Sequence, residues 1–256
     1  MENPRKTQGA RPRWQLAVLW TLSMLLFPVL LAQGMRTRRV ALRLPEALGP
    51  REGLAGEGEP RFSVMGIGDS VIAGVGVDEM KDGLVASIAA AIQTRREIPV
   101  KWLARGENGA KLADLCESLR RTPLPPADMT VVSIGVNDVS GLTSLIRWQM
   151  QVMDLMALLG PKRRVILLGV PPMEYFQALP QPLRWVLGIR AALLDKTLQQ
   201  LGEYAEQVTW LNIGEKFDAE HLASDGYHPN ALACVEIASE MVEAVFDKQK
   251  KVARIE

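Results

Sequence analysis

The stretch RFSVMGIGDSVIAGVGV, residues 61–77, decides the fold of this chain. Its apolar, β-branched start ends abruptly in GIGDS, residues 66–70, a pattern typical of a buried strand that turns sharply at its carboxyl end. In an open α/β sheet, ligands bind beyond the carboxyl ends of the strands. Ser70 is therefore a candidate nucleophile, although a serine at such a turn can equally cap a helix.

Short apolar runs alternate with stretches of helical periodicity along the rest of the domain. This alternation is the sequence form of a parallel α/β sheet. We expect five strands, at residues 62–67, 99–103, 129–134, 164–168 and 208–211. We expect helices at residues 83–95, 111–121, 145–159, 182–206 and 229–250. One folded domain is thus predicted, from residue 61 to residue 256.

The composition fits a globular domain and gives no electrostatic case for binding nucleic acid. Hydrophobic residues make up 48% of the chain and charged residues 23%, and the net charge is +1. Cys116 and Cys234 stand in different predicted helices, outside any C-x-x-C or Cys/His cluster. We expect buried free thiols, with a disulfide as the alternative if the domain is exported. No metal or organic cofactor is expected, and nothing in the composition indicates an oligomeric state.

An uncharged apolar run, residues 14–33, follows a basic segment, residues 1–13. About twenty apolar residues are enough to cross a bilayer, so we interpret the run as a membrane anchor. A cleaved signal sequence or a buried core helix is the alternative. We expect the domain to lie on the periplasmic side of a bacterial inner membrane. The alternative is a secreted or periplasmic protein after cleavage. Arginines flank the run on both sides in similar numbers, so the positive-inside rule gives little preference for either orientation. Residues 34–60 are predicted to be a linker or extended arm.

Polar residues also follow the other predicted strands. The third strand ends in GVND, residues 135–138, and the amide of Asn137 can donate a hydrogen bond to an oxyanion. Its alternative role is to cap a helix or tie down a loop. Gly109 lies between the second strand and a helix, so its N–H is a second candidate donor, unless the segment is a plain turn.

The chain contains two histidines, His221 and His228. Asp225, three residues before His228, can hold one ring nitrogen and leave the other free to take a proton. Asp225 can alternatively cap the last helix. His221 has no such partner and is predicted to lie on the surface. The proline-rich segment at residues 171–182 is predicted to be either a lip that covers the site or a surface loop with no role in the site. Its apolar candidates for a lip are Met173, Tyr175, Phe176 and Leu179.

All of these groups follow the carboxyl ends of strands, so we expect them at one edge of the sheet. Gly-Asp-Ser at 68–70, Gly109, Gly-Val-Asn-Asp at 135–138 and Asp-x-x-His at 225–228 resemble the four sequence blocks of the SGNH (GDSL-type) hydrolases. The resemblance spans residues 61–246. It implies a flavodoxin-like three-layer α/β/α sandwich with a five-stranded parallel sheet, preceded here by the N-terminal hydrophobic helix.

The resemblance also implies a role for each residue of the site. Ser70 is the nucleophile, and His228, oriented by Asp225, is the general base and then the general acid. The amides of Ser70 and Gly109 and the side chain of Asn137 form the oxyanion hole.

Two positions depart from the family pattern. Val71 stands where the family name has leucine, and Lys111 stands where the second block often has threonine. Neither position performs chemistry in the family, so the departures concern the substrate more than the reaction. The expected activity is hydrolysis of a small-molecule or lipid carboxylic ester through an acyl-enzyme. Deacetylation of a sugar or cell-envelope polymer, acyl transfer to another acceptor, and binding without turnover are the alternatives.

Overall fold

One mixed sheet organises the domain. The structure is a computed structural model that describes residues 11–213 and 220–252. Within these residues six strands form the sheet, in the spatial order β1-β3-β2-β4-β5-β6. The strands are β1 (Glu52–Ala55), β2 (Phe62–Gly68), β3 (Val100–Gly106), β4 (Met129–Ser133), β5 (Val165–Leu168) and β6 (Val208–Leu211). Strand β2 lies between β3 and β4 and is parallel to both, so the sheet has a flavodoxin-like switch point at the end of β2.

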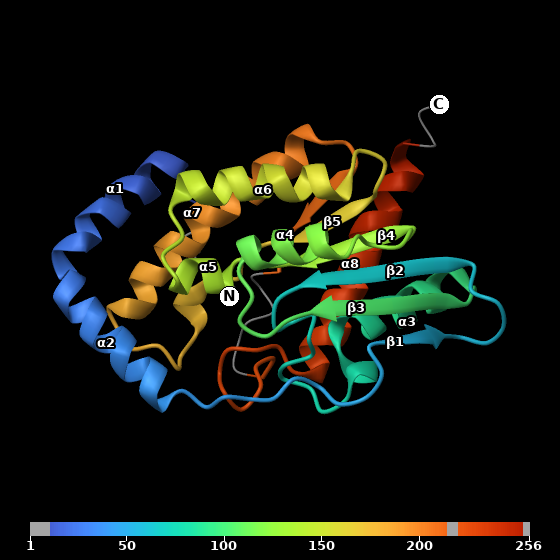
Figure 1. Cartoon of the computed structure of the whole chain (residues 1–256), viewed down its shortest axis with the longest axis horizontal. Coiled ribbons are helices and arrows are strands. Elements are labelled where there is room, and N and C mark those ends of the chain that lie inside the picture. Colours follow the sequence, from blue (N-terminus) through green and yellow to red (C-terminus); the bar gives the residue numbers. More distant parts are fainter. Residues whose placement is uncertain (1–10, 214–219, 253–256) are drawn as a thin grey trace, which may run out of the picture.

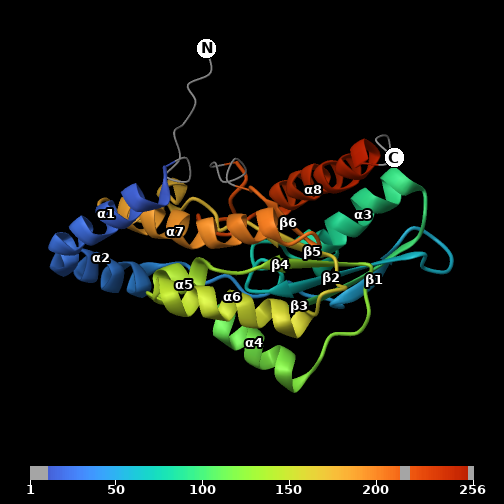
Figure 2. The ribbon, with the colours of Figure 1, turned by 90° about the horizontal axis from the view of Figure 1, so that it is seen from above.

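Helices cover both faces of this sheet (Figure 1). Figure 2 shows α3, α7 and α8 on one face and α4, α5 and α6 on the other, which confirms the predicted three-layer sandwich. The helices of the domain are α3 (Leu84–Arg96), α4 (Leu112–Arg121), α5 (Val136–Ser140), α6 (Leu145–Leu159), α7 (Leu183–Tyr204) and α8 (Ala231–Val252). Strands β4 and β5 are buried along their whole length, because helices shield both of their faces. Both cysteines are free and buried.

The sheet has one strand more than the five that the sequence predicts. Strand β1 runs antiparallel to β3 at the edge of the sheet, inside the segment interpreted as a linker or arm, residues 34–60. Its four residues alternate between exposed and half-buried, so they carry no apolar pattern. A Cβ atom at Gly53 would lie 2.8 Å from the ring of Trp102, so the strand packs closely only because a glycine stands there.

The N-terminal apolar segment forms α1 (Arg13–Ser23) and α2 (Phe27–Val40), joined by a short 3-10 turn. By length and composition the helical stretch Arg13–Val40 can cross a membrane, with a mean hydropathy of 2.0 in its best window. A signal sequence passes the same test. Leu16 is fully buried against side chains of α7. Figures 1 and 2 show α1 and α2 beyond the carboxyl ends of the strands, beside α7.

Much of the surface of α1, of α2 and of the turn between them is apolar and exposed. These side chains include Trp14, Val18, Leu22, Leu25, Phe27, Val29, Leu31 and Met35. We call this set the outer apolar face. The helices therefore carry a packed side against α7 and an unpacked apolar side that faces away from the domain.

Candidate active site

At the end of β2, Gly68 approaches Ser133 of the parallel strand β4 at very short range. Its φ is +143°, and a Cβ atom there would lie 1.8 Å from the carbonyl oxygen of Ser133. That close approach is open only to glycine. The N–H of Asp69 then donates to the same carbonyl at 3.0 Å. The turn brings Ser70 to the carboxyl edge of the sheet, as the sequence predicts.

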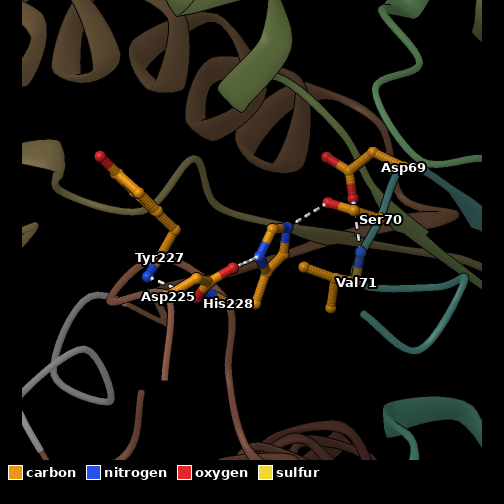
Figure 3. Close-up of polar contacts among 6 residues, drawn as sticks. All are labelled: Asp69, Ser70, Val71, Asp225, Tyr227 and His228. Atoms are coloured by element: carbon orange, nitrogen blue, oxygen red, sulfur yellow. Dashed lines mark hydrogen bonds and ion pairs between the residues drawn. The ribbon is translucent and has the colours of Figure 1, made fainter. Parts of the chain in front are cut away.

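Three side chains form a hydrogen-bonded chain at this edge (Figure 3). The Oγ of Ser70 lies 2.9 Å from Nε2 of His228, and Nδ1 of His228 lies 2.6 Å from Oδ2 of Asp225. The second carboxylate oxygen, Oδ1, accepts the N–H groups of Tyr227 at 2.9 Å and His228 at 3.1 Å. The structure therefore brings Ser70 together with Asp225 and His228, which share a loop far away in the chain, as the sequence predicts.

Asp225 is held as a carboxylate. Burial acts to raise its pKa, but the hydrogen bonds from the His228 ring and from two backbone N–H groups outweigh burial and lower the pKa below its ordinary value. An ionised Asp225 accepts the proton of Nδ1, which leaves Nε2 of His228 free to accept the hydroxyl proton of Ser70. This arrangement can activate a serine for attack on a carbonyl carbon.

The loop of the histidine rests directly on the loop of the serine. Gly76, with φ +106°, is the point of contact, because a Cβ atom there would lie 2.4 Å from the carbonyl oxygen of Pro229 and 3.1 Å from Cβ of His228. The absence of a side chain at position 76 lets the two loops approach each other. The spacing between Ser70 and His228 depends on this approach.

The three candidate oxyanion donors differ in their placement relative to the cavity beside Ser70. Asn137 lies in α5, a short helix that was not predicted from the sequence, and its Nδ2 donates to the carbonyl of Ala110 at 3.0 Å. One amide proton of Asn137 remains for a ligand. The N–H groups of Ser70 and Gly109 donate to none of the residues that the structure describes. Gly109 is exposed and, unlike its neighbour Asn108, does not line the cavity beside Ser70.

A cavity of about 320 Å³ opens beside Ser70, Asn137 and His228. Its lining is mainly apolar and comes from the strand ends, from α7 and α8, and from the segment before α7. Three of the four predicted lip residues, Met173, Phe176 and Leu179, line the cavity, and Tyr175 does not. Other apolar lining residues are Leu84, Ile134, Val136, Leu168, Leu187, Ile213 and Ile237. The end of α2 also lines it, which the sequence did not reveal.

Two buried carboxylates support the site and have no role in the sequence analysis. Asp69, 2% exposed, accepts hydrogen bonds on Oδ1 from the N–H of Val71 and the hydroxyl of Ser133, both at 3.2 Å. Burial raises the pKa of Asp69 to about 6, against the effect of these hydrogen bonds. The only sequence signal for Asp69 is its position between the strand-ending glycine and Ser70.

The second buried carboxylate, Asp138, joins α5 to α4. Its Oδ2 accepts the N–H of Leu112 at 2.9 Å, and its Oδ1 accepts the hydroxyl of Thr143 at 2.8 Å. Burial raises the pKa of Asp138. The contact fixes the start of α4, and hence the loop that carries Gly109, relative to Asn137.

The prediction for His221 is wrong. Its side chain is buried, and its Nε2 lies 3.2 Å from Oε2 of Glu236 on α8. The partner is fifteen residues away in sequence, so local spacing could not reveal it. Among residues 11–213 and 220–252, no group of three or more His, Cys, Asp or Glu side chains is placed to hold a metal ion.

Comparisons with known proteins identify a family by sequence and similar solved structures by fold. The sequence model of the GDSL-like lipase/acylhydrolase family matches residues 67–233. No curated protein sequence gives a significant match. Among solved structures, the lipase Lip_vut3 from a goat rumen metagenome has a TM-score of 0.58 and 18% identity, over 72% of this chain and 96% of that one. A lipolytic G-D-S-L family protein from Veillonella parvula has a TM-score of 0.55 and 16% identity, over 72% and 98%.

A third solved structure, the acetylxylan esterase Axe2 from Geobacillus stearothermophilus, has a TM-score of 0.54 and 16% identity, over 72% of this chain and 94% of that one. At such identities the structural likeness establishes the fold alone. The sequence match is the stronger finding, because it extends over more than half of the chain and runs from the strand that delivers Ser70 to beyond His228. The chain therefore belongs to the GDSL-like lipase/acylhydrolase family.

Proposed function

We propose that this protein is a serine esterase that cleaves carboxylic esters through an acyl-enzyme intermediate. The observation that carries the proposal is the hydrogen-bonded chain from the Ser70 hydroxyl through His228 to Asp225, with separations of 2.9 and 2.6 Å. The cavity beside the hydroxyl gives an ester access to it. In other serine hydrolases the same three groups, so connected, generate a nucleophile at neutral pH.

In the proposed mechanism, Oγ of Ser70 attacks the ester carbonyl while Nε2 of His228 takes the hydroxyl proton. The N–H groups of Ser70 and Gly109 and the amide of Asn137 donate to the developing oxyanion. His228 then gives its proton to the leaving alcohol, and the acyl group remains on Ser70. Water attacks the acyl-enzyme with His228 again as base, which releases the acid and restores the hydroxyl.

An acyl chain is the proposed occupant of the cavity. The mainly apolar lining supports this choice, because most of the cavity wall would offer no hydrogen-bond partner to the hydroxyl groups of a sugar. Deacetylation of a sugar polymer is the alternative within the same fold, and acyl transfer to another acceptor is a further alternative. A binding module without turnover is disfavoured by the intact Ser70, His228 and Asp225 contacts.

We further propose that α1 and α2 hold the protein at a membrane, with the catalytic domain on the periplasmic side of a bacterial inner membrane. The outer apolar face supports attachment, because a large exposed apolar surface is typical of a site that contacts a membrane. Packing of Leu16 against α7 favours a retained segment over a cleaved signal, because cleavage would uncover the α7 side chains that Leu16 buries.

The test is hydrolysis of p-nitrophenyl esters of graded chain length and of acetylated xylo-oligosaccharides by the full chain in a neutral detergent. Ser70→Ala should lower kcat by about 10⁴-fold or more and abolish labelling by a fluorophosphonate. Ser239→Ala, which changes an exposed serine on α8, is the matched control and should behave as the wild type. Retention of more than a tenth of the activity by Ser70→Ala would refute the nucleophile assignment. Faster hydrolysis of the acetylated sugars would favour the deacetylase alternative.

A further inference from the structure

The last turn of α2 lies against the catalytic cavity. Thr37, Arg38 and Ala41 line it together with Ser70. The position of this turn is fixed by Gln33, one helical turn earlier. The side chain of Gln33 donates from Nε2 to the carbonyl of Gln181 at 2.6 Å and accepts the N–H of Leu183 at 3.0 Å.

Arg38 lies at this cavity without a charged partner among the residues that the structure describes. The carboxyl group in the lining belongs to Asp69, which is 2% exposed and accepts two hydrogen bonds. Arg38 is exposed, and its guanidinium makes no ion pair or hydrogen bond with any residue in the described part of the chain. An exposed guanidinium beside a mainly apolar cavity matches a ligand with an apolar body and an anionic end.

The surroundings of Arg38 point to an amphiphile as that ligand. The outer apolar face covers α1 and α2 up to the turn that carries Arg38, and Arg36, Arg39 and Arg43 are exposed nearby. Arginines at the end of an apolar helix lie at the level of lipid headgroups. The rim of the cavity would then lie where the polar and apolar parts of a membrane amphiphile meet.

We infer that Arg38 is a specificity-determining residue that binds the anionic headgroup of an amphiphilic ester. The acyl chain of that ester would occupy the apolar cavity, and its ester carbonyl would face Ser70. The inference rests on the proposed esterase function. A guanidinium group can bind either a phosphate or a carboxylate through two parallel hydrogen bonds. The predicted substrate is therefore an ester with one such anionic group close to the scissile bond.

The experiment uses the full chain in neutral detergent micelles and three substrates with one acyl chain. They are a 1-acylglycerol 3-phosphate, an acyl ester of a hydroxycarboxylic acid, and an uncharged monoacylglycerol. The readout is the ratio of kcat/KM for an anionic ester to kcat/KM for the uncharged one. Arg38→Gln should lower this ratio about 10-fold to 100-fold, because a hydrogen bond to a charged group is lost. Arg38→Lys should restore a large part of it.

Arg39→Gln is the matched control, because it removes the same charge at the next position, outside the cavity lining. Its ratio should equal that of the wild type. An unchanged ratio in Arg38→Gln, or an equal fall in Arg39→Gln, would overturn the inference. The anionic ester that shows the larger effect identifies the headgroup as phosphate or carboxylate.

A second readout separates this inference from the esterase proposal. Binding of dodecyl phosphate and of an uncharged dodecyl glycerol ether to the Ser70→Ala protein is measured by equilibrium dialysis. If the wild type hydrolyses no ester, the esterase proposal fails, and the dialysis still decides the role of Arg38. A preference for dodecyl phosphate that disappears with Arg38→Gln supports the inference, and equal binding in both proteins contradicts it.

Discussion

The guanidinium of Arg190 lies over the indole of Trp20, with Cζ 4.8 Å from the ring centroid. Arg190 is buried in α7, and its Nε donates to the carbonyl of Val139 in α5 at 3.1 Å. A second nitrogen of Arg190 donates to the carbonyl of Thr143. One side chain therefore connects the N-terminal helices to the short helix that carries Asn137.

Replacing Trp20 with leucine should weaken this connection. The substitution keeps an apolar side chain but removes the cation–π contact, worth about 1–2 kcal/mol in a desolvated setting. We expect the thermal midpoint of the full chain in detergent to fall by about 2–8 °C. Trp14→Leu, at a tryptophan that is 67% exposed on the same helix, should leave the midpoint unchanged. Equal shifts in both variants would show that the Trp20 contact carries no stability of its own.

Asp225→Asn should reveal how the carboxylate controls the histidine. Asparagine can still accept the two backbone N–H groups, but its amide would face Nδ1 of His228 as a donor. The ring would then carry its proton on Nε2 and could not take the proton of Ser70. We expect kcat for p-nitrophenyl butyrate to fall about 10⁴-fold, with an unchanged circular dichroism spectrum. A loss of less than tenfold would mean that Asp225 does not orient the ring during turnover.

Asp69 should make the protein less stable as the pH rises from 4 to 6. Its pKa is about 6 in the folded protein, raised by burial from the ordinary 3.8, so the folded state binds the proton more tightly than the unfolded state. The stabilisation is therefore complete below pH 3.8 and is lost as the pH approaches 6. Relative to Asp69→Asn, the wild type should lose about 2 kcal/mol of unfolding free energy between pH 4 and pH 6. Chemical unfolding of both proteins at pH 4, 5, 6 and 7 measures the difference, and a constant difference would contradict the raised pKa.

Leu187→Trp should shorten the preferred acyl chain. Leu187 lies on α7 and lines the cavity, so a larger side chain there takes up space that the chain would fill. Relative to the acetyl ester, we expect kcat/KM for a dodecanoyl ester to fall about tenfold or more. Leu232→Trp, at an exposed leucine of α8 outside the cavity, is the control for surface effects. An unchanged chain-length profile in Leu187→Trp would place the acyl chain elsewhere.

The sequence predicts much of this fold because its signals are local. Helix α6 spans residues 145–159 as expected, since Ser144 caps its first turn by accepting the N–H of Arg147 and Gly160 follows its last residue. The buried strands are equally visible as continuous apolar runs bounded by polar residues. The same locality explains the site, because Ser70 and Asn137 come within a few residues of the end of a strand, and His228 comes a few residues before a helix.

The features that the sequence does not reveal depend on partners far away in the chain. The residues of β1 have no strand pattern of their own, and what identifies the strand is its packing against Trp102 of β3. The buried position of His221 depends on its contact with Glu236 of α8. The end of α2 reaches the cavity because the side chain of Gln33 binds the backbone at the start of α7. Its partner there, Leu183, lies 150 residues later in the sequence. No period or motif within α2 encodes that contact.

Gly76 carries no functional group, yet two loops of the site meet at its Cα, so the position tolerates no side chain. Any substitution there would push the imidazole away from the hydroxyl that it serves. In a random-mutagenesis screen, inactive clones should therefore cluster at codon 76 as densely as at the codons for Ser70 and His228. A spacer of this kind would be mistaken for a chemical participant by anyone who ranks positions by loss of activity alone.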